Sequence, residues 1–374
     1  MRLVLLGRDA NRVLAFRGSL ITAAQAAGHE VFAITGPGDA NTQAALRAAD
    51  VAWHAVPLNG GSLHPLRDLA YRREVERLLR RIKADAVLAY NPKPLAHGTV
   101  AARRAGVARV VAMVTGLGHG FVGGGWRERL VRAAKVWLYQ RAFKACDALL
   151  LQNPSDVADL DRAGAFGPGN RSKVRLIAGS GVDVERFRPV PLPAGPHFLM
   201  IARPLREKGL PEYLHAARQV RRLLPQADCA WLGPRHDANP SAIPERELRT
   251  LLAQSGVRHL PECVDVRPAI GSCSVFVLPS HREGTSKVML EAMAMGRPVI
   301  TADAPGCRDV VMDQVQGRTV PVRSVDALVD AMLQLGHTAS LRDRMGAAAR
   351  KRVLERHDAR HVNTVILEAL TGAG

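Results

Sequence analysis

The chain has 374 residues, which at roughly 150 residues per domain predicts two or three domains. Hydrophobic residues make up 47% of the chain and charged residues 23%, a balance that excludes a disordered protein. The formal net charge of +18 suggests an anionic partner, such as nucleic acid, an acidic membrane surface or a phosphorylated substrate.

Cysteine use and hydropathy exclude further classes of protein. No segment approaches the roughly 18 uninterrupted apolar residues of a membrane-spanning helix, and the run Leu3–Leu6 is too short for a signal peptide. An odd number of scattered cysteines with no CxxC pair is typical of reduced thiols in a cytoplasmic protein and predicts no structural metal site. These cysteines are Cys146, Cys229, Cys263, Cys273 and Cys307.

The first half of the chain alternates apolar runs with helical segments. Residues 3–6 predict a buried strand, Ser19 predicts the start of a helix that runs to residue 27, and residues 31–35 predict a second strand. This order indicates an α/β fold. Further strands are predicted at 86–90, 110–115 and 148–152, with helices rich in Ala, Leu and Arg between them.

The same pattern restarts after a proline-rich stretch. Residues 189–196 hold four prolines, which predicts an extended linker. Strands are then predicted at 197–202, 230–233, 275–279 and 298–302, and helices at 210–223, 325–335, 341–355 and 362–370. Near-continuous apolar strands favour parallel sheets covered on both faces. We therefore expect two Rossmann-like domains with parallel sheets that face a central cleft, where a ligand binds at the carboxyl ends of the strands.

Charge is distributed unevenly between the two halves. Residues 1–187 carry 27 Lys and Arg against 15 Asp and Glu, a net +12, and the remaining residues carry 25 against 19, a net +6. The anionic partner is therefore expected mainly at the first half.

A first candidate motif, Arg203–Gly209, follows a predicted strand and opens a predicted helix. Arg203 and Lys208 are cations five residues apart at a helix N-terminus, where charge and backbone amides can hold a diphosphate. The alternative is a solvated loop with ordinary surface charges.

A second candidate motif, Glu283–Met293, places two glutamates eight positions apart across a junction between a loop and a helix. Gly284 allows close approach to a ligand, and the amides that follow it are free donors at the start of the helix. Glu291, about two turns along the helix, is placed to accept hydrogen bonds from a ribose. The alternative is an ordinary amphipathic helix with one exposed glutamate.

These motifs and their flanks resemble the GT4 family of glycosyltransferases, which have the GT-B fold. The matching segments are VTGLGHGF (114–121), IARPLREKG (201–209), LGPRHDANPSAI (232–243) and VFVLPSHREGTSKVMLEAMAMGRPVITADAPGCRDVV (275–311). The resemblance covers nearly the whole chain. It implies an acceptor-binding domain at 1–187, a nucleotide-sugar-binding domain at 188–355, and a final helix, 356–374, that crosses back to the first domain.

The resemblance also implies a retaining sugar transfer from a nucleotide-diphosphate sugar, without a metal ion or another cofactor. Arg203 and Lys208 should bind the diphosphate, Glu283 the hydroxyls of the donor sugar, and Glu291 the ribose. The donor loop should offer its amides to the sugar and the phosphates. It comprises Gly284, Thr285, Ser286, Lys287 and Val288. Two side-chain cations would then neutralise the charge of the leaving diphosphate.

Two positions depart from the pattern of the family. Related sequences often carry Phe-Pro or Thr-Pro where this chain has Thr285-Ser286, which leaves the shape of the sugar pocket open. After the Gly116-Leu117-Gly118 loop stands His119, which is a candidate for the catalytic histidine that related enzymes place near the donor sugar. The alternative is a surface histidine in a glycine loop.

On the acceptor side, the chain resembles bacterial enzymes that extend glycans on undecaprenyl diphosphate at the cytoplasmic face of the membrane. Arg17, with Gly116 and Gly118, is expected to meet the acceptor, although Arg17 could instead point to solvent. Segment 123–144 is a candidate amphipathic helix for an anionic membrane surface. Its apolar stripe could instead pack on the sheet. The stripe comprises Trp126, Leu130, Ala134, Trp137 and Leu138, beside Arg129, Arg132 and Lys135.

The resemblance thus implies transfer of a HexNAc or hexose from a UDP-sugar to a lipid-diphosphate-linked saccharide, by an enzyme held peripherally on the inner face of the membrane. A nucleotide-sugar 2-epimerase of the same fold is one alternative. A nucleic-acid-binding protein is another, but it is disfavoured by the 4% of aromatic residues and the lack of a recognisable binding motif.

Overall fold

The computed structural model describes residues 1–58, 64–117, 126–237, 239 and 241–373. The chain forms two compact units: unit 1 is Met1–Ser180 with Ala359–Gly374, and unit 2 is Gly181–Asp358. The chain therefore passes between the units at 180/181 and 358/359, where the sequence predicts 187/188 and 355/356. The unit 2 residues next to the two crossings lie side by side, because Val182 and Asp358 form a parallel β-bridge.

Unit 1 is built on a parallel sheet of seven strands in the order β3-β2-β1-β4-β5-β6-β7. The strands are β1 (Arg2–Leu6), β2 (Glu30–Thr35), β3 (Ala52–Ala55), β4 (Ala86–Tyr90), β5 (Arg109–Val114), β6 (Ala148–Leu151) and β7 (Val174–Leu176). The central strands β1, β4 and β5 consist almost entirely of buried apolar residues. Burial on both faces accounts for these runs, which show no alternation of apolar and polar residues.

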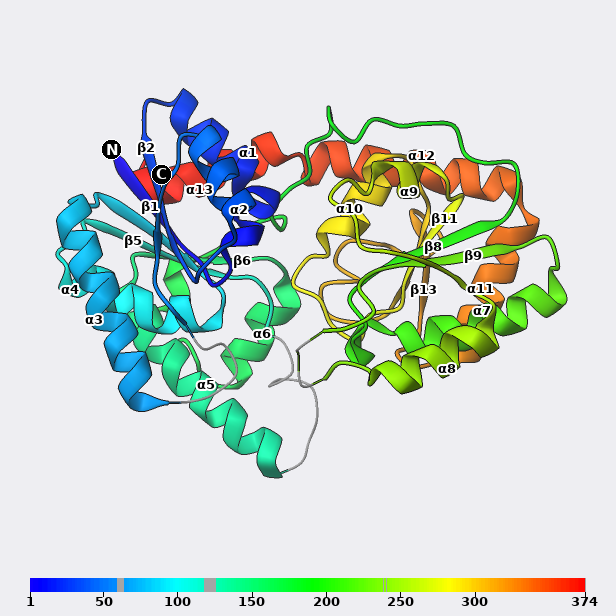
Figure 1. The fold of residues 1–374 in the computed structure, drawn as a ribbon, viewed down its shortest axis with the longest axis horizontal. Helices are drawn as coiled ribbons and strands as arrows, with labels where there is room; N and C mark the ends of the chain where they lie inside the picture. Colours follow the sequence, from blue (N-terminus) through cyan, green and yellow to red (C-terminus); the bar gives the residue numbers. More distant parts are fainter. Residues whose placement is uncertain (59–63, 118–125, 238, 240, 374) are drawn as a thin grey trace. The chain divides into compact units, whose positions relative to one another are not determined.

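Helices cover both faces of the unit 1 sheet (Figure 1). On one face lie α3 (Pro65–Ile82), α4 (Thr99–Arg104), α5 (Trp126–Ala145), α6 (Pro154–Arg162) and the π-helical turn Pro94–Gly98. On the other lie α1 (Val13–Ala26), α2 (Ala40–Ala48) and α13 (Ala359–Thr371). The last helix belongs to unit 1 because its apolar face, which includes Ile366, packs against α1 and β5.

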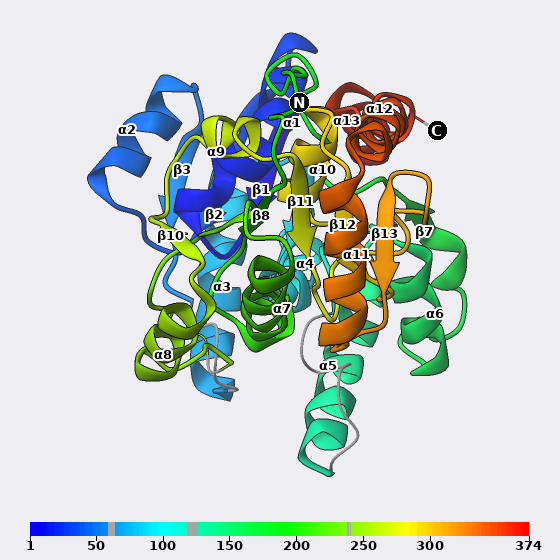
Figure 2. The same ribbon diagram turned by 90° about the vertical axis from the view of Figure 1, so that its right-hand side faces the viewer.

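Unit 2 repeats the design with six parallel strands in the order β10-β9-β8-β11-β12-β13 (Figure 2). The strands are β8 (His197–Ile201), β9 (Asp228–Leu232), β10 (Arg258–Leu260), β11 (Val275–Leu278), β12 (Val299–Ala302) and β13 (Gly317–Val320). The helices α7 (Leu210–Leu223), α8 (Glu245–Ser255) and α11 (Val325–His337) lie on one face, and α9 (Arg267–Gly271), α10 (Lys287–Ala294) and α12 (Ala339–Arg356) lie on the other.

The predicted linker at 189–196 is wrong, because this stretch is fastened to unit 2. Buried Arg297 donates hydrogen bonds to the carbonyls of Val190 and Pro191, at 2.6 and 3.3 Å, as well as to Ile270, Gly271 and Met295. Arg342, which is also buried, donates to the carbonyl of Ala194 at 3.1 Å. The carbonyls of an extended segment need donors when they are buried, and these guanidinium groups supply them.

Other differences concern helix starts and edge strands. Helix α1 begins at Val13 rather than Ser19 and passes through Gly18, because Val13, Leu20 and Ala24 form one buried face. The short strands β3, β7, β10 and β13 escape prediction. All four are outermost in their sheets, and β3, β7 and β10 are only partly buried, so they lack the apolar runs of the central strands.

Helix α5 turns only part of its length to the core. The residues that it buries are Tyr139, Ala142 and Phe143, with Val136 against them. The predicted stripe is a different one: Leu130 is 62% exposed and Trp137 is 53% exposed. The side chain of Trp126 lies outside the described part of the chain. No helix within the described residues is long and apolar enough to span a membrane.

Candidate functional site

The loops that follow β8 and β11 are joined by hydrogen bonds to one carbonyl. The Ser280 hydroxyl and the His281 N–H donate to the carbonyl of Glu207, at 3.1 and 2.8 Å. Gly209 has φ +74°, and a Cβ there would lie 2.2 Å from the Pro279 carbonyl oxygen. Because β8 and β11 are neighbouring parallel strands, both loops leave the same edge of the sheet. Because Gly209 has no Cβ, the two loops can approach closely enough to form these hydrogen bonds.

This junction brings together two of the predicted site residues. Lys208 Nζ lies 2.6 Å from Oε1 and 2.8 Å from Oε2 of Glu283. The two side chains are 23% and 10% exposed, so the pair is partly shielded from water. The charge-assisted contact to both oxygens holds the lysine and the carboxylate at one point of the sheet edge.

A third loop fixes the backbone of Glu283. Its N–H donates to the Pro305 carbonyl at 3.0 Å, in the loop after β12. Gly306 has φ +79°, and a Cβ there would lie 2.1 Å from the Glu283 carbonyl oxygen. The APG sequence at 304–306 therefore packs against the backbone of Glu283. Three adjacent strands, β8, β11 and β12, thus position the pair.

Arg203, the other predicted diphosphate ligand, pairs with a residue to which the sequence motifs assign no role. Its Nη1 lies 3.1 Å from Oδ2 of Asp237, in the loop after β9. Oδ1 of Asp237 accepts the Asn239 N–H at 2.8 Å, and Oδ1 of Asn239 accepts the Ser241 N–H at 3.0 Å. Asp237 is part of the segment LGPRHDANPSAI. An acidic residue after a buried strand on this edge is the signal that could have found it.

Helix α10 carries the second glutamate. Ser286 precedes its first residue, is 7% exposed and makes no side-chain capping bond. The first N–H groups of a helix have no partner within the helix, so the start of α10 is a site where amides can meet an anion. Thr285 lies beside it and donates its hydroxyl to the Gly284 carbonyl at 2.9 Å.

Glu291 is the most perturbed carboxyl at this edge. It is 8% exposed, and it forms a long ion pair of 3.9 Å with Lys287, one turn away on the same helix. Burial raises the pKa of Glu291 to about 7, although Lys287 and Arg186 oppose the shift. At neutral pH this carboxyl is therefore divided between a form that only accepts hydrogen bonds and one that also donates.

In unit 1, Arg17 is buried and does not point to solvent. It is 2% exposed, and its Nη1 donates to Ser180 Oγ at 2.9 Å. Its Nη2 contacts Met113 Sδ at 3.0 Å, and the guanidinium lies 4.7 Å from the centre of the Tyr90 ring. Burial lowers the pKa of Arg17. Its role at the acceptor stays a prediction, and it requires a ligand that reaches this buried space.

The predicted glycine loop of unit 1 is described only at its start. Gly116 follows β5 and has φ +118°, a conformation that favours glycine. Gly118 and His119 lie outside the described residues, so the predicted catalytic histidine is not placed. Among the residues that the structure covers, no group of three His, Cys, Asp or Glu side chains could hold a metal ion.

The chain matches two family descriptions that together cover most of its length. Residues 15–178 match the "Glycosyl transferase 4-like domain" and residues 195–337 match "Glycosyl transferases group 1". The chain belongs to the GT4 family of glycosyltransferases.

Relatives and solved structures agree with this family. The N,N'-diacetylbacillosaminyl-diphospho-undecaprenol alpha-1,3-N-acetylgalactosaminyltransferase of Campylobacter jejuni is 26% identical over 91% of each chain. A GDP-mannose-dependent alpha-mannosyltransferase of Mycobacterium tuberculosis is 30% identical over 75% of this chain and 71% of that protein. The crystal structure of Anabaena Alr3699/HepE in complex with UDP-glucose covers all of both chains with a TM-score of 0.80 at 17% identity. That likeness shows the GT-B fold.

The residues that the sequence predicts for the donor therefore lie on one edge of one sheet. Cations stand after β8, a carboxylate after β11, and the start of α10 follows that carboxylate. Lys208 forms an ion pair with Glu283, whereas Arg203 forms one with Asp237. The motif spacing alone did not predict that the two cations have different partners.

Proposed function

We propose that this glycosyltransferase moves a HexNAc or hexose, with retention of configuration, from a UDP-sugar to a saccharide linked to a membrane lipid diphosphate in bacterial glycan assembly. The observation that carries the proposal is the contact of Lys208 with Glu283 next to the start of α10. That arrangement offers one ligand a cation, backbone amides and a carboxylate that can accept hydrogen bonds from hydroxyl groups. A nucleotide-diphosphate sugar has the matching phosphates and hydroxyls.

In this proposal, the donor replaces partners that are already present. Lys208 pairs with Glu283, and Arg203 pairs with Asp237. A diphosphate that binds both cations would release the Glu283 carboxylate to accept from hydroxyls of the sugar. Binding of the phosphates and binding of the sugar would then be coupled through one ion pair, which favours a donor with both groups over a free nucleotide.

The two cations would also stabilise the products of bond cleavage. Negative charge develops on the diphosphate as the sugar departs, and fixed positive charge at that place lowers the barrier. We propose that Arg203 and Lys208 supply this charge without a metal ion. Glu291, on the same helix as the proposed amides, would meet the ribose hydroxyls with a carboxyl that can accept or donate.

The acceptor and the location of the enzyme are proposed from the relative and from unit 1. The name of the Campylobacter relative specifies a diphospho-undecaprenol acceptor. Leu130, Val131 and Trp137 are exposed on α5 beside the exposed cation Arg129, a surface that suits an anionic bilayer. We therefore place the enzyme at the inner face of the cell membrane, with no resident cofactor.

The decisive experiment is a panel of donors against lipid-diphosphate saccharides, read by mass spectrometry. UDP-HexNAc, UDP-hexose and GDP-mannose would each be offered with a short isoprenyl diphosphate that carries one sugar. We expect one UDP-sugar to extend the acceptor, with the donor's anomeric configuration retained in the product's NMR spectrum. Lys208→Ala should lower the rate of product formation about 10²-fold or more, whereas Lys351→Ala, at an exposed lysine of α12, should leave it unchanged.

The same panel tests the competing functions. If the nucleotide sugar is converted to its epimer without any acceptor, the enzyme is a 2-epimerase. If transfer requires GDP-mannose, the donor is a GDP-sugar rather than a UDP-sugar. Tight duplex or single-strand binding at physiological salt, with no transfer to any acceptor, would favour a nucleic-acid-binding protein.

A further inference from the structure

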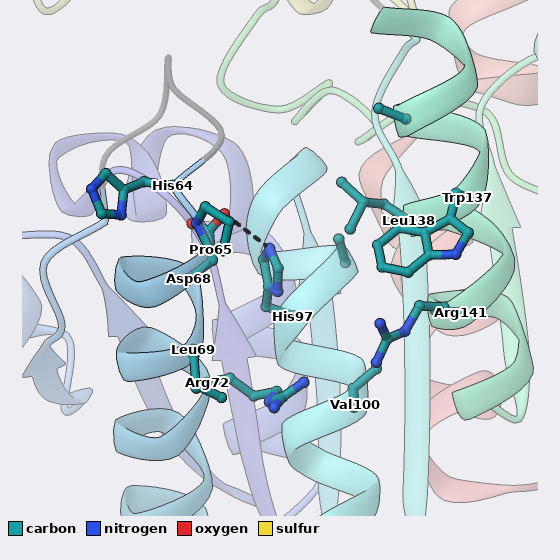
Figure 3. Close-up of a pocket in the computed structure, with 12 residues that line it drawn as sticks. His64, Pro65, Asp68, Leu69, Arg72, His97, Val100, Trp137, Leu138 and Arg141 are labelled. Atoms are coloured by element: carbon teal, nitrogen blue, oxygen red, sulfur yellow. Dashed lines mark ion pairs between the residues drawn. The ribbon is translucent and has the colours of Figure 1, made fainter. Parts of the chain in front are cut away.

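Unit 1 contains a cavity of about 410 Å³, and none of the predicted donor or acceptor residues that the structure describes lines it. It lies between α3, the π-helical turn Pro94–Gly98 and α5 (Figure 3). His64 and Pro65 stand at the start of α3, and the turn follows β4, so this end of the cavity lies at the carboxyl edge of the sheet. Its volume is in the range of small-molecule sites.

Two arginines face this space without a carboxylate partner. Arg72 extends from α3 and Arg141 from α5, and Figure 3 shows their guanidinium groups approaching from opposite sides. Neither makes an ion pair within the described part of the chain, and Nε of Arg72 is buried with no hydrogen-bond partner there. Burial first, and then the like charges of Arg104 and Arg141, lower the pKa of Arg72. An anion between the two guanidinium groups would relieve both effects.

Among the described residues that line the cavity, the one carboxylate is already neutralised. Asp68 Oδ1 lies 2.8 Å from Lys93 Nζ, and its Oδ2 lies 3.7 Å from Nε2 of His97. Burial lowers the pKa of His97, which keeps the imidazole neutral at pH 7. The cavity therefore keeps the positive charge of Arg72 and Arg141.

The rest of the wall is apolar and continues onto exposed apolar surface. Leu69, Val100, Ala134, Trp137 and Leu138 line it. Arg141 lies 4.7 Å over the ring of Trp137, so the aromatic surface adjoins the cation. Outside the cavity, Leu66 on α3 is 73% exposed, and Leu130 on α5 is 62% exposed. Positive charge next to a hydrocarbon wall is complementary to an amphiphile with an anionic head.

We propose that this cavity binds a polyisoprenyl diphosphate, with Arg72 and Arg141 on the phosphates and Trp137 and Leu138 against the first isoprene units. The inference rests on the proposed function, because it gives the lipid part of the acceptor a place in unit 1. The saccharide would then extend toward the carboxyl edge of the sheet, where Gly116, one of the predicted acceptor residues, follows β5.

Direct binding tests the charged half of the proposal without any sugar transfer. Farnesyl diphosphate would be titrated into the full chain by calorimetry. Arg72→Glu and Arg141→Glu should each weaken binding about tenfold or more, because they put a negative charge where the phosphates bind. Arg73→Glu, at an exposed arginine next along α3, should stay within about twofold. Circular dichroism would verify that each variant is folded. Equal affinity in all four proteins would overturn the proposal.

The apolar half is tested with the head group alone. Trp137→Ala should weaken farnesyl diphosphate about tenfold and leave inorganic diphosphate unchanged. If inorganic diphosphate binds the wild type as tightly as farnesyl diphosphate, the isoprene contact is wrong. If the arginine variants lose only binding to phosphatidylglycerol vesicles and keep farnesyl diphosphate, the arginines serve the membrane surface and the proposed ligand is wrong.

Transfer assays separate this inference from the function on which it rests. With a lipid-linked acceptor, Arg141→Glu should raise the acceptor KM about tenfold while the donor KM stays unchanged. If the wild type transfers to that acceptor and both arginine variants match it, the cavity proposal fails and the function stands. If the wild type transfers to no lipid-linked acceptor yet binds farnesyl diphosphate through Arg72 and Arg141, the function fails and the cavity stands.

Discussion

Both carboxylate oxygens of Glu283 lie within 2.8 Å of Lys208 Nζ, at 2.6 and 2.8 Å. The two residues are 75 positions apart and stand on loops after adjacent strands. A cation and a carboxylate that are both predicted to bind the donor thus form an ion pair with one another. If a ligand binds to one of the two residues, the other loses its ion-pair partner. We therefore expect the two residues to act as a coupled unit.

The coupling predicts non-additive kinetics. Lys208→Ala and Glu283→Gln should each lower kcat about 10²- to 10³-fold, and the double variant should fall little further, since either change already disrupts the unit. Arg206→Ala is the matched control, because Arg206 lies in the same loop and pairs with Glu247 at an exposed site. It should keep kcat within about twofold. Additive losses in the double variant would show that the two residues act independently.

A second prediction concerns the glycine at the junction of the two loops. Gly209→Ala forces a Cβ to 2.2 Å from the Pro279 carbonyl, in addition to the strain of φ +74°. Gly296→Ala is the control, since Gly296 has φ +79° but nothing closer than 4.0 Å. The control should lose only about 1–2 kcal/mol of unfolding free energy. Gly209→Ala should lose more and should also weaken donor binding, measured by urea unfolding and by calorimetry. Equal losses of stability with unchanged donor affinity would contradict the role of this close approach.

Much of the fold could be predicted from sequence because its central strands carry continuous apolar runs. Helix α1 shows the limit, since the sequence predicts its start at Ser19, whereas the helix begins at Val13 and passes through Gly18. A glycine costs a helix about 1 kcal/mol, and the burial of Leu20 and Ile21 on the same face outweighs that cost. The proline-rich stretch at 189–196 shows a second limit. Nothing in the sequence distinguishes buried Arg297, which binds its carbonyls, from the many arginines on the surface.

The sequence motifs single out the candidate donor residues one by one, but they do not predict how these residues pair. Motif spacing placed Arg203 and Lys208 in one loop and suggested one shared task. Which carboxylate meets which cation depends on strand order, and β8 lies between β9 and β11. Arg203 therefore reaches Asp237 on one side, and Lys208 reaches Glu283 on the other. The cavity near Arg72 and Arg141 could not be predicted either, because it forms only when helices that are distant in sequence pack together.

A third prediction follows from Glu291. Its pKa is about 7 in the folded chain, against an ordinary value of 4.5 for the unfolded chain, so between these values the folded state holds a proton that the unfolded state has lost. Its contribution to stability is therefore full below pH 4.5 and falls as the pH rises toward 7, by an order of about 3 kcal/mol. Glu291→Gln removes this titration. The difference in unfolding free energy between the two proteins should shift in favour of the variant across this window. Parallel pH profiles in urea unfolding would refute it.

A fourth prediction concerns metal ions. If Arg203 and Lys208 carry the charge of the diphosphate, turnover should be unchanged in excess EDTA and should not rise when Mg²⁺ or Mn²⁺ is added. Arg203→Ala should then lower kcat/KM about tenfold or more for the donor in EDTA and in Mg²⁺ alike. Activity that is lost in EDTA and restored by Mg²⁺ would assign this charge to a metal ion instead.

A fifth prediction tests the membrane surface on α5. The first half of this helix buries none of its described side chains, and Leu130 and Val131 are 62% and 47% exposed. Apolar side chains beside cations stabilise binding to an anionic bilayer. The double variant Leu130→Ser with Val131→Ser should therefore lower the affinity for phosphatidylglycerol vesicles, measured by sedimentation, about tenfold. Leu223→Ser is the matched control, because Leu223 on α7 of unit 2 is also 62% exposed. Binding should weaken for all three proteins in high salt, because the cations on α5 contribute a screened attraction. If the α5 and α7 variants sediment alike, Leu130 and Val131 have no special part in membrane contact.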